Sequence, residues 1–379
     1  MTRIGFAYNQ KPETAVGLVG EASELRSDDK PPSIDDAFAE WDSATTIDAV
    51  ASALSTYGTV VRLEATPDFP ERLRAERPDL VFNIAEGLHG TNREAHVPAI
   101  CEFFDVPYSG SDPFTLSLCL HKAKTKDFLS AHGIPTAPYV LIESCGQLET
   151  LLRNEHPRFP LPPSRFPLFI KPVQEGSSKG ITERNFVRTL DELDEQVRHL
   201  LDAYYQPVIV ETFLPGAEFT CGVLGNGTNA RVLPLVGMNF GSLPPGSVPI
   251  YGYEAKWVWD VPSDPLDIFE CPAPIDPRLQ SQIEDVVLRA YRVLGCRDWS
   301  RIDVRLDAAG IPNIVEVNPL PGILPDPADN SCLPKAARAA GLSYDALIQA
   351  ALCHAAERAG IRLQFAGTDA ELRSSTRVA

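Results

Sequence analysis

Hydrophobic and polar residues alternate most clearly between residues 301 and 322. Apolar side chains occupy every second position from Ile302 to Leu306, and charged side chains occupy the positions between them. This period of two is typical of a half-buried strand. Residues 307–310 have the composition of a turn, and the alternation resumes from Ile311 to Val317. The stretch therefore predicts a β-hairpin with one polar face.

The first 110 residues or so alternate between strand-like and amphipathic helical segments. Strands are expected at residues 3–8, 59–63 and 79–84, and helices at 46–57 and 69–75. Such a rhythm predicts a small parallel sheet that binds ligands at the C-terminal ends of its strands. Residues 20–32 are polar without periodicity and are predicted to form a loop insertion.

The remainder of the chain mixes strands and helices without that regular alternation. Residues 107–115 predict a turn and linker, and a helix opens at residue 121. Further strands are expected at 138–142, 168–171, 207–213, 221–224 and 231–235, and further helices at 190–204, 277–294, 333–340 and 343–359. The fold class is therefore α/β followed by α+β. We expect domains at 1–115, 116–206 and 207–365, and a frayed tail at 366–379.

Charge and cysteine content narrow the class of protein. The 379 residues include 34 basic and 51 acidic side chains, a net charge of −17, so non-specific binding to nucleic acid or anionic lipid is not expected. No apolar run reaches membrane-spanning length, and the N-terminus predicts a strand rather than a signal peptide. The eight cysteines are scattered without a Cys-x-x-Cys pair, which indicates reduced thiols in a cytoplasmic protein.

Oxygen ligands gather on the polar face of the predicted hairpin. A turn near residues 308 and 309 would let Asp303, Glu316 and Asn318 converge. Two carboxylates and an amide suit Mg²⁺, which binds hard oxygen ligands. Arg301 shares the face and could hold a phosphoryl group or a developing oxyanion. The alternative is a polar hairpin face in water, because carboxylates on exposed sheets are common.

Lysines and a Gly/Ser loop provide candidate phosphate contacts. Three lysines within residues 122–126 form a local anion site in an acidic chain, and Lys171 ends a strand that leads into loop 174–180. The loop offers backbone N–H groups and the hydroxyls of Ser177 and Ser178. A plain mobile turn is the alternative, since neither the P-loop pattern nor the dinucleotide-binding glycine pattern is present.

A strand edge and a long loop extend this candidate nucleotide site. The backbone from Glu211 to Leu214 could hydrogen-bond an adenine-like base, and Glu218 could accept from ribose hydroxyls. Residues 240–275 form a long loop rich in Pro, Gly and aromatic residues, which is typical of a lid. Lys256 and Trp257 lie in it.

A polar loop follows the third predicted strand, at the mouth of the N-terminal sheet, and leads into a helix predicted from Arg93 to Phe104. Glu86, His89 and Glu94 in this loop are candidate substrate contacts. The alternative is that Glu94 only stabilises the first turn of a helix and that Glu86 is solvent-exposed.

Five strings of residues occur in one order along the chain. They are His121-Lys-Ala-Lys-Thr-Lys126, Phe169-Ile-Lys-Pro-Val-Gln-Glu-Gly-Ser-Ser-Lys-Gly180, Val208-Ile-Val-Glu-Thr-Phe-Leu-Pro-Gly-Ala-Glu-Phe-Thr220, Tyr253-Glu-Ala-Lys256, and Arg301-Ile-Asp with Glu316-Val-Asn-Pro-Leu-Pro-Gly322. Together they resemble the ATP-grasp superfamily, and within it the D-alanine–D-alanine ligases. The resemblance runs from about residue 79 to residue 360, and it implies an ATP-grasp fold.

The resemblance also implies ATP and two Mg²⁺ ions, with Mn²⁺ as an alternative. The implied ATP contacts are Lys122, Lys171 and Lys256 at the phosphates, Ser177 and Ser178 in the loop over them, Glu211 and Leu214 beside adenine, and Glu218 at ribose. The implied metal ligands are Asp303, Glu316 and Asn318. The implied catalytic groups are Arg301, the Gly322 backbone and Ser178, with Ser331 holding the second substrate's carboxylate.

Two departures concern the substrates. The family's Gly-Gly-x-Ser-x-Glu loop, which holds the first amino acid's ammonium, is absent from residues 5–13, and Trp257 replaces the usual lid tyrosine or phenylalanine. We predict an ATP-dependent carboxylate–amine ligase that forms a dipeptide or related amide through an acyl phosphate. One alternative is a ligase of the same fold for another amino acid or a specialised-metabolite acid; another is an ATP-binding regulator. The expected partners are small-molecule acids, and the resemblance implies a homodimer.

Overall fold

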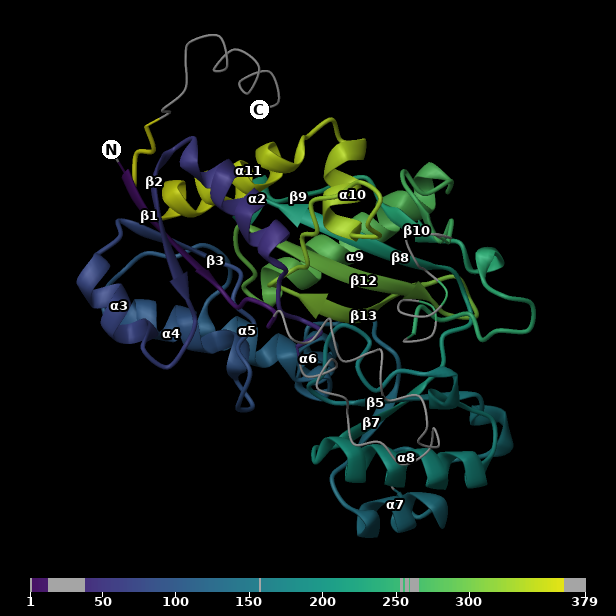
Figure 1. The fold of residues 1–379 in the computed structure, drawn as a ribbon. Coiled ribbons are helices and arrows are strands. Elements are labelled where there is room, and N and C mark those ends of the chain that lie inside the picture. Colours follow the sequence, from purple (N-terminus) through teal and green to yellow (C-terminus); the bar gives the residue numbers. More distant parts are fainter. Residues whose placement is uncertain are drawn as a thin grey trace.

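The computed structural model describes residues 2–12, 38–156, 158–252, 255, 259 and 266–364. Within these residues the chain forms three β-sheets with helices packed around them (Figure 1). The predicted combination of α/β and α+β parts is confirmed. The predicted insertion at 20–32, the lid residues Lys256 and Trp257, and the predicted tail at 366–379 lie outside the described residues.

A three-stranded parallel sheet forms the N-terminal part, as predicted. Its order is β2-β1-β3, and its strands are β1 (Thr2–Tyr8), β2 (Gly58–Glu64) and β3 (Leu80–Asn83). Helices α2 (Ala44–Ser55), α3 (Phe69–Glu76) and α4 (His96–Phe103) connect or follow these strands. Helix α2 begins where the Ser43 hydroxyl accepts a hydrogen bond from the Thr46 N–H at 3.2 Å, which satisfies one free donor of the first turn.

A four-stranded antiparallel sheet forms the central part. Its order is β4-β7-β5-β6, and its strands are β4 (Tyr139–Ile142), β7 (Val208–Thr212), β5 (Leu168–Pro172) and β6 (Phe186–Val187). Helices α7 (Cys145–Leu152) and α8 (Leu190–Tyr204) pack on it through a shared apolar core, as the lower part of Figure 1 shows. The division into domains stays a prediction, but a boundary at residue 207 would separate β7 from the strands with which it pairs.

The largest sheet is antiparallel and contains the predicted hairpin. Its order is β11-β10-β8-β12-β13, with β9 paired to β8. The strands are β8 (Glu218–Leu224), β9 (Arg231–Val232), β10 (Val236–Met238), β11 (Phe269–Glu270), β12 (Trp299–Leu306) and β13 (Pro312–Asn318). Helix α9 (Pro277–Val293) covers one face with its apolar side, and the other face is left for polar side chains and for α10 (Cys332–Ala339).

The C-terminal helix joins the largest sheet to the N-terminal part. Helix α11 (Tyr344–Arg358) lies beside α2 in Figure 1 and packs against it. Buried side chains from both helices, from β1 and β3, and Trp299 of β12 belong to one apolar core. This packing fixes the mouth of the parallel sheet relative to the polar face of β12 and β13.

Two local predictions are wrong. Sequence analysis predicts a turn and linker over 107–115, whereas α5 (Pro113–Leu120) begins inside it and precedes α6 (Lys122–Ala131). The start signal is present, since the Asp112 carboxylate accepts from the Thr115 N–H at 2.8 Å and Pro113 is the first helical residue. The apolar residues of α5 form no clear stripe, so the pattern alone does not reveal it. The predicted helix from Arg93 begins as a 3₁₀ turn (Arg93–Ala95) before α4.

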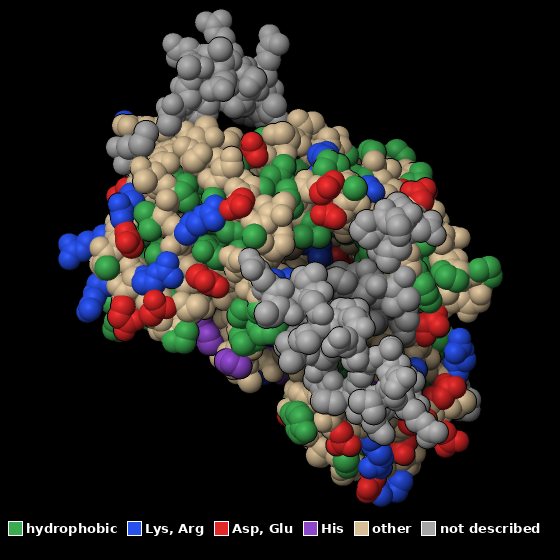
Figure 2. Space-filling view, viewed as in Figure 1, with side chains coloured by type: hydrophobic (Ala, Val, Ile, Leu, Met, Phe, Trp, Pro, Cys, Tyr) green, Lys and Arg blue, Asp and Glu red, His purple; other side chains and the backbone are tan. Residues whose placement is uncertain are grey.

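Charged side chains of both signs lie on the surface. On the described part of the face in Figure 2, acidic and basic side chains are interspersed rather than gathered in one basic patch. No helix among the described residues combines the length and apolar character needed to cross a membrane.

Candidate active site

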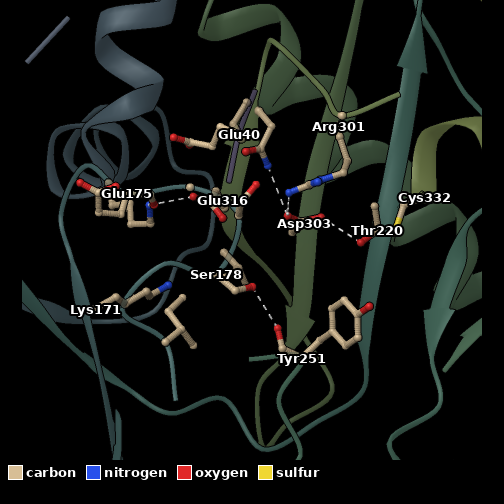
Figure 3. A pocket seen from close by; sticks show the side chains of 18 of the residues that line it. Glu40, Lys171, Glu175, Ser178, Thr220, Tyr251, Arg301, Asp303, Glu316 and Cys332 are labelled. Carbon is tan, nitrogen blue, oxygen red and sulfur yellow. Dashed lines mark hydrogen bonds and ion pairs between the residues drawn. The ribbon is translucent and has the colours of Figure 1, made fainter. Parts of the chain in front are cut away.

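A cavity of about 450 Å³ lies where the three sheets meet. Side chains of β5 and β7 line one part, the polar face of β8, β12 and β13 lines another, and residues from the N-terminal part complete it. Figure 3 shows Lys171 on one side of this space, Arg301 and Asp303 on the other, and Glu316 and Ser178 between them. A cavity that collects charged groups from several elements is the usual form of an active site.

The register of the β12–β13 hairpin sets its polar face. Asp303 lies opposite Glu316, and Arg301 lies opposite Asn318, so the predicted convergence of these side chains is observed. The register shifts just after Asp303, which is a β-bulge, a feature often found beside active sites. Ile302, Val304 and Leu306 of β12 point to the other face and pack with α9.

Asp303 accepts hydrogen bonds from three neighbours. The donors are Thr220 Oγ1 at 2.9 Å, Arg301 Nη2 at 3.1 Å and Asn318 Nδ2 at 3.3 Å. Burial raises the pKa of Asp303, Arg301 opposes the rise only in part, and Glu316 adds to it. A further cation between the two carboxylates would therefore stabilise the charged form of Asp303.

Lys122, in the first turn of α6, joins the hairpin to the Gly/Ser loop. Its Nζ lies 2.8 Å from Glu316 Oε1 and donates to the Glu175 carbonyl at 2.5 Å. Burial raises the pKa of Glu316, but Lys122 and Lys171 outweigh that effect and lower it overall. Glu316 is thus held as a carboxylate at the centre of the cavity.

Glu211 of β7 holds two lysines in place. Its Oε1 lies 2.7 Å from Lys126 Nζ, and its Oε2 lies 2.8 Å from Lys171 Nζ. Burial alone would raise the pKa of Glu211, but the two lysines outweigh it and lower the pKa to about 2. The predicted strand edge at Glu211 is wrong, because β7 lies between β4 and β5 and Glu211 is paired on both sides. A planar base would instead meet the chain where β7 ends, beside Leu214, which lines the cavity.

The Gly/Ser loop of residues 174–180 follows β5 and forms turns over the cavity. Ser177 and Ser178 have φ angles of 48° and 62°, a left-handed conformation that costs about 1–3 kcal/mol per non-glycine residue. The Ser178 hydroxyl donates to the Tyr251 carbonyl at 3.2 Å, a contact drawn in Figure 3. Strain of this kind persists only where surrounding contacts hold it.

Glu218 of β8 is paired within the cavity. Its Oε2 accepts from Arg305 Nη1 at 2.7 Å, and the Arg305 guanidinium lies 4.5 Å from the centre of the Phe213 ring. Burial raises the pKa of Glu218, and Arg305 opposes that rise only in part. Sequence analysis did not assign Arg305, although the same alternation that placed Arg301 puts it on the polar face.

Acidic side chains dominate the wall that the N-terminal part contributes. Glu40, Asp42, Glu86 and Glu94 all line the cavity. Burial raises the pKa of Asp42 and that of Glu94 to about 7, and it raises the pKa of Glu86 well above its ordinary value. His89, a predicted substrate contact, is exposed and is not among the residues that line the cavity.

The loop after β13 brings Gly322 and Ser331 together at the cavity. The Ser331 hydroxyl accepts from the Leu324 N–H at 3.2 Å and donates to the Gly322 carbonyl at 3.4 Å. Ser331 is buried and lines the cavity, as does Gly322. Both residues therefore line the same cavity as Arg301. Lys256 and Trp257 lie outside the described residues.

Sequence analysis missed the charged residues that support the Gly/Ser loop. Glu40, Arg93 and Lys179 form a buried ion network beside it. Lys179 lies within the string from Phe169 to Gly180, so its charge is visible in the sequence. Glu40 follows a long stretch without periodicity, and no local pattern links it to a loop so distant in the sequence.

A family model, related sequences and solved structures all show similarity to the same group of proteins. The family model described as "D-ala D-ala ligase C-terminus" matches residues 128–353. The D-alanine–D-alanine ligase of Cupriavidus taiwanensis is 33% identical over 270 residues, covering 70% of this chain and 72% of that protein. The uncharacterized protein y4sG of Sinorhizobium fredii is 32% identical over 278 residues, covering 73% and 75%.

The chain belongs to the D-alanine–D-alanine ligase family. The family's fold extends over most of it, since the Bacillus anthracis D-alanine–D-alanine ligase solved with ATP covers 94% of this chain and 98% of its own, with a TM-score of 0.65 and 20% identity. The expectations of an ATP-grasp fold and of an ATP-dependent, amide-forming ligase are confirmed.

The polar face of the hairpin fits the metal that this family membership implies. Asp303, Glu316 and Asn318 offer hard oxygen atoms of the kind that Mg²⁺ prefers. Among the described residues, no three His, Cys, Asp or Glu side chains gather at one place to hold a metal by themselves. A Mg²⁺ ion here would therefore need the Asn318 amide and phosphate oxygens as further ligands.

Proposed function

We propose that this ligase activates a carboxylic acid, such as an amino acid, with ATP and then joins it to an amine. The observation that carries the proposal is that three groups of residues line one cavity. These are the lysines on α6 and β5, the strained Gly/Ser loop, and the polar face of β12 and β13. Together they supply charge neutralisation, positioning and exclusion of water, which phosphoryl transfer requires.

The nucleotide would lie between the two antiparallel sheets. Lys122 and Lys171 would neutralise its phosphates, and the loop with Ser177 and Ser178 would cover them. Glu211 and Leu214 would border the base, and Glu218 would accept from the ribose hydroxyls. Lys256 would add a third cation from the segment outside the described residues.

Asp303, Glu316 and Asn318 would hold two Mg²⁺ ions, with Mn²⁺ as the alternative. Bound there, the metal would neutralise charge on the phosphate oxygens. Asp303 contributes a carboxylate kept in place by Thr220, Arg301 and Asn318. Glu316 contributes a carboxylate whose charge Lys122 maintains.

In the first step, an oxygen of the acid would bond to the γ-phosphorus while ADP leaves. In the second, the amine nitrogen would bond to the acyl carbon, the amine would lose a proton, and phosphate would leave. Arg301, Ser178 and the Gly322 backbone would stabilise the tetrahedral oxyanion between these events. Ser331 would hold the carboxylate of the second substrate. No side chain of the protein needs to act as a nucleophile.

The identity of the acid is the less defined part of the proposal. D-alanine is the first candidate, because the relatives with named activities are D-alanine–D-alanine ligases. A different amino acid or a specialised-metabolite acid is the second, because the family's Gly-Gly-x-Ser-x-Glu loop is absent from residues 5–13. The wall of the cavity at this end instead includes Glu40, Asp42, Glu86 and Glu94. This acidic wall favours a substrate that presents an ammonium group. Trp257 would contribute to substrate binding from the lid.

Phosphate release tests the proposal directly. The protein is given ATP and Mg²⁺ with D- and L-amino acids, singly and in pairs, and products are identified by mass spectrometry. D-alanyl-D-alanine formed from D-alanine alone would establish the first candidate. Turnover only with another acid would establish the second, and the absence of phosphate release with every pair would contradict ligation of amino acids.

Location and assembly remain proposals. We place the enzyme in the cytoplasm because its eight cysteines are free thiols and its substrates are small molecules rather than nucleic acid or membrane. A homodimer, which the resemblance implies, is to be tested by light scattering.

A further inference from the structure

The Gly/Ser loop places two strained residues side by side. Ser177 and Ser178 both have positive φ angles, 48° and 62°, which side chains other than glycine avoid. Their hydroxyls and N–H groups are the donors that would face the phosphates. A loop in this conformation needs contacts from outside itself, because otherwise it would relax to unstrained angles.

One carboxylate, that of Glu40, touches the loop on both sides of the two serines. Its Oε2 lies 2.9 Å from Nζ of Lys179, the residue after Ser178. A Cβ added to Gly176, the residue before Ser177, would lie 2.2 Å from Glu40 Oε1. The carboxylate therefore occupies space that only a glycine at position 176 leaves open.

Arg93 fixes the position of that carboxylate. Its Nη2 lies 2.9 Å from both Glu40 oxygens, and its Nη1 donates to the Gln174 carbonyl at 3.0 Å. Lys179 also lies 2.5 Å from Glu175 Oε2. The loop is thus held by Arg93 at its start and by Glu40 across its strained centre.

The three charged side chains of this network are buried. The side chains of Arg93, Glu40 and Lys179 are 8%, 9% and 10% exposed. Burial raises the pKa of Glu40, but Arg93 and Lys179 outweigh it and lower the pKa overall, so all three groups are charged. Removing one member of such a network leaves the others buried without compensation, which is far more disruptive than breaking a surface pair.

We propose that Glu40 is a positioning residue for the phosphate loop, acting through Lys179, Arg93 and the open face of Gly176. It keeps Ser177 and Ser178 turned toward the cavity before ATP arrives. The inference rests on the proposed function, since it assigns ATP phosphates to this loop. It gives the N-terminal part of the chain a role in nucleotide binding that is separate from any contact with the acid.

The test compares ATP affinity with local order in six full-length proteins: wild type, Glu40→Gln, Gly176→Ala, Glu195→Gln, Lys179→Arg and Lys179→Met. Gly176→Ala retains every charge and displaces only the Glu40 carboxylate. Glu195→Gln is the matched control, because Glu195 pairs with Arg184 in the same part of the chain but is 70% exposed. ATP with Mg²⁺ is titrated by calorimetry, hydrogen exchange is followed over residues 174–180, and thermal unfolding is recorded.

We expect Glu40→Gln and Gly176→Ala to weaken ATP binding by about tenfold or more, since a small misplacement of positioning groups has effects of up to about 100-fold. Exchange should rise in residues 174–180 and stay at the wild-type level in β12 and β13. Glu195→Gln should match wild type. A conservative Lys179→Arg should bind ATP better than Lys179→Met, because only the former retains the ion pair.

Three results would overturn the proposal. Wild-type ATP affinity and exchange in both variants would remove Glu40 from nucleotide binding while leaving the proposed function intact. Faster exchange throughout the described chain, with lower thermal stability, would make Glu40 a general stabilising residue. Failure of the wild type itself to bind ATP would overturn the proposed function, and this positioning role with it.

Discussion

The nucleotide end and the acid end of the cavity are built in different ways. At the proposed nucleotide end, Lys171 lies near the end of β5, the Gly/Ser loop follows at once, and the face proposed to hold metal is a single hairpin. At the proposed acid end, Asp42 comes from the segment before α2, and Glu86 and Glu94 come from the segment between β3 and α4. ATP presents the same groups to every enzyme of this kind, so short fixed strings serve it, whereas a variable substrate is met by loops.

The two ends also differ in how charge is balanced. Glu211 and Glu316 at the nucleotide end each have cations close by, and their pKa values are lowered despite burial. Glu86 and Glu94 at the acid end have raised pKa values, because burial and neighbouring carboxylates outweigh nearby cations. The first end is prepared for an anion, and the second holds negative charge at a cost that a bound ammonium would reduce.

The largest expected effect is at the hairpin. Glu316→Ala removes one of two carboxylates proposed to hold metal and leaves Lys122 buried without its partner. We expect turnover of ATP to fall by about 1000-fold or more, as for other groups that stabilise transferring phosphate. The measurement is phosphate release at saturating ATP. Turnover near the wild-type rate would remove Glu316 from the metal site.

A smaller loss is expected at the phosphate contacts. Lys171→Met should weaken ATP binding by about 10- to 100-fold, since one buried charge-assisted contact is lost. Calorimetry with a non-hydrolysable ATP analogue measures it. Lys124→Met is the matched control, because Lys124 lies on α6 near Lys122 but is exposed. Equal affinity for both variants would contradict the assignment of Lys171.

This contrast also explains how much could be predicted from sequence. Alternation in the hairpin placed Arg301, Asp303, Glu316 and Asn318 on one face because side chains in a strand repeat every two residues. It could not place Glu40, whose contact with Lys179 depends on how the N-terminal part folds back onto the Gly/Ser loop. Periodicity describes elements, and it carries no information about which loops meet.

Helix α5 shows a second limit. Its cap at Asp112 could be read locally, but the apolar residues of α5 do not form one stripe, because the helix is packed between other elements. The pairing of Glu211 with two lysines was not predicted, for a related reason. Its place in a strand was visible in the sequence, but neither the interior position of that strand nor its two lysine partners from α6 and β5 could be inferred from a local pattern.

The acid end should show an effect on stability that depends on pH. The pKa of Glu94 is raised by burial to about 7, above an ordinary value near 4.3. The folded protein therefore binds a proton more tightly than the unfolded chain, and stability falls as pH rises through this window. Glu94→Gln should thus be more stable than wild type at pH 8 by about 1–3 kcal/mol, with the difference shrinking toward pH 5.

Urea unfolding at pH 5 and pH 8 measures this difference. The same variant should raise the KM for the acid while its affinity for ATP stays within about twofold, because Glu94 is proposed to contact only the acid. Glu71→Gln is a control on α3, since Glu71 is exposed. A stability difference that does not change with pH would show that the charge of Glu94 is not the cause.

The smallest effect is expected at Ser331, on the amine side of the cavity. Its hydroxyl accepts from the Leu324 N–H and donates to the Gly322 carbonyl, so it both shapes the loop and faces the proposed amine substrate. Ser331→Ala removes one neutral hydrogen-bonding group, worth about 0.5–1.5 kcal/mol, which corresponds to a rise of about 2- to 12-fold in the KM for the amine. ATP affinity should not change, because Ser331 is not among the proposed nucleotide contacts. An equal change in both constants would mean that the loop after β13 acts on the whole cavity, and the division into separate ends would then be too simple.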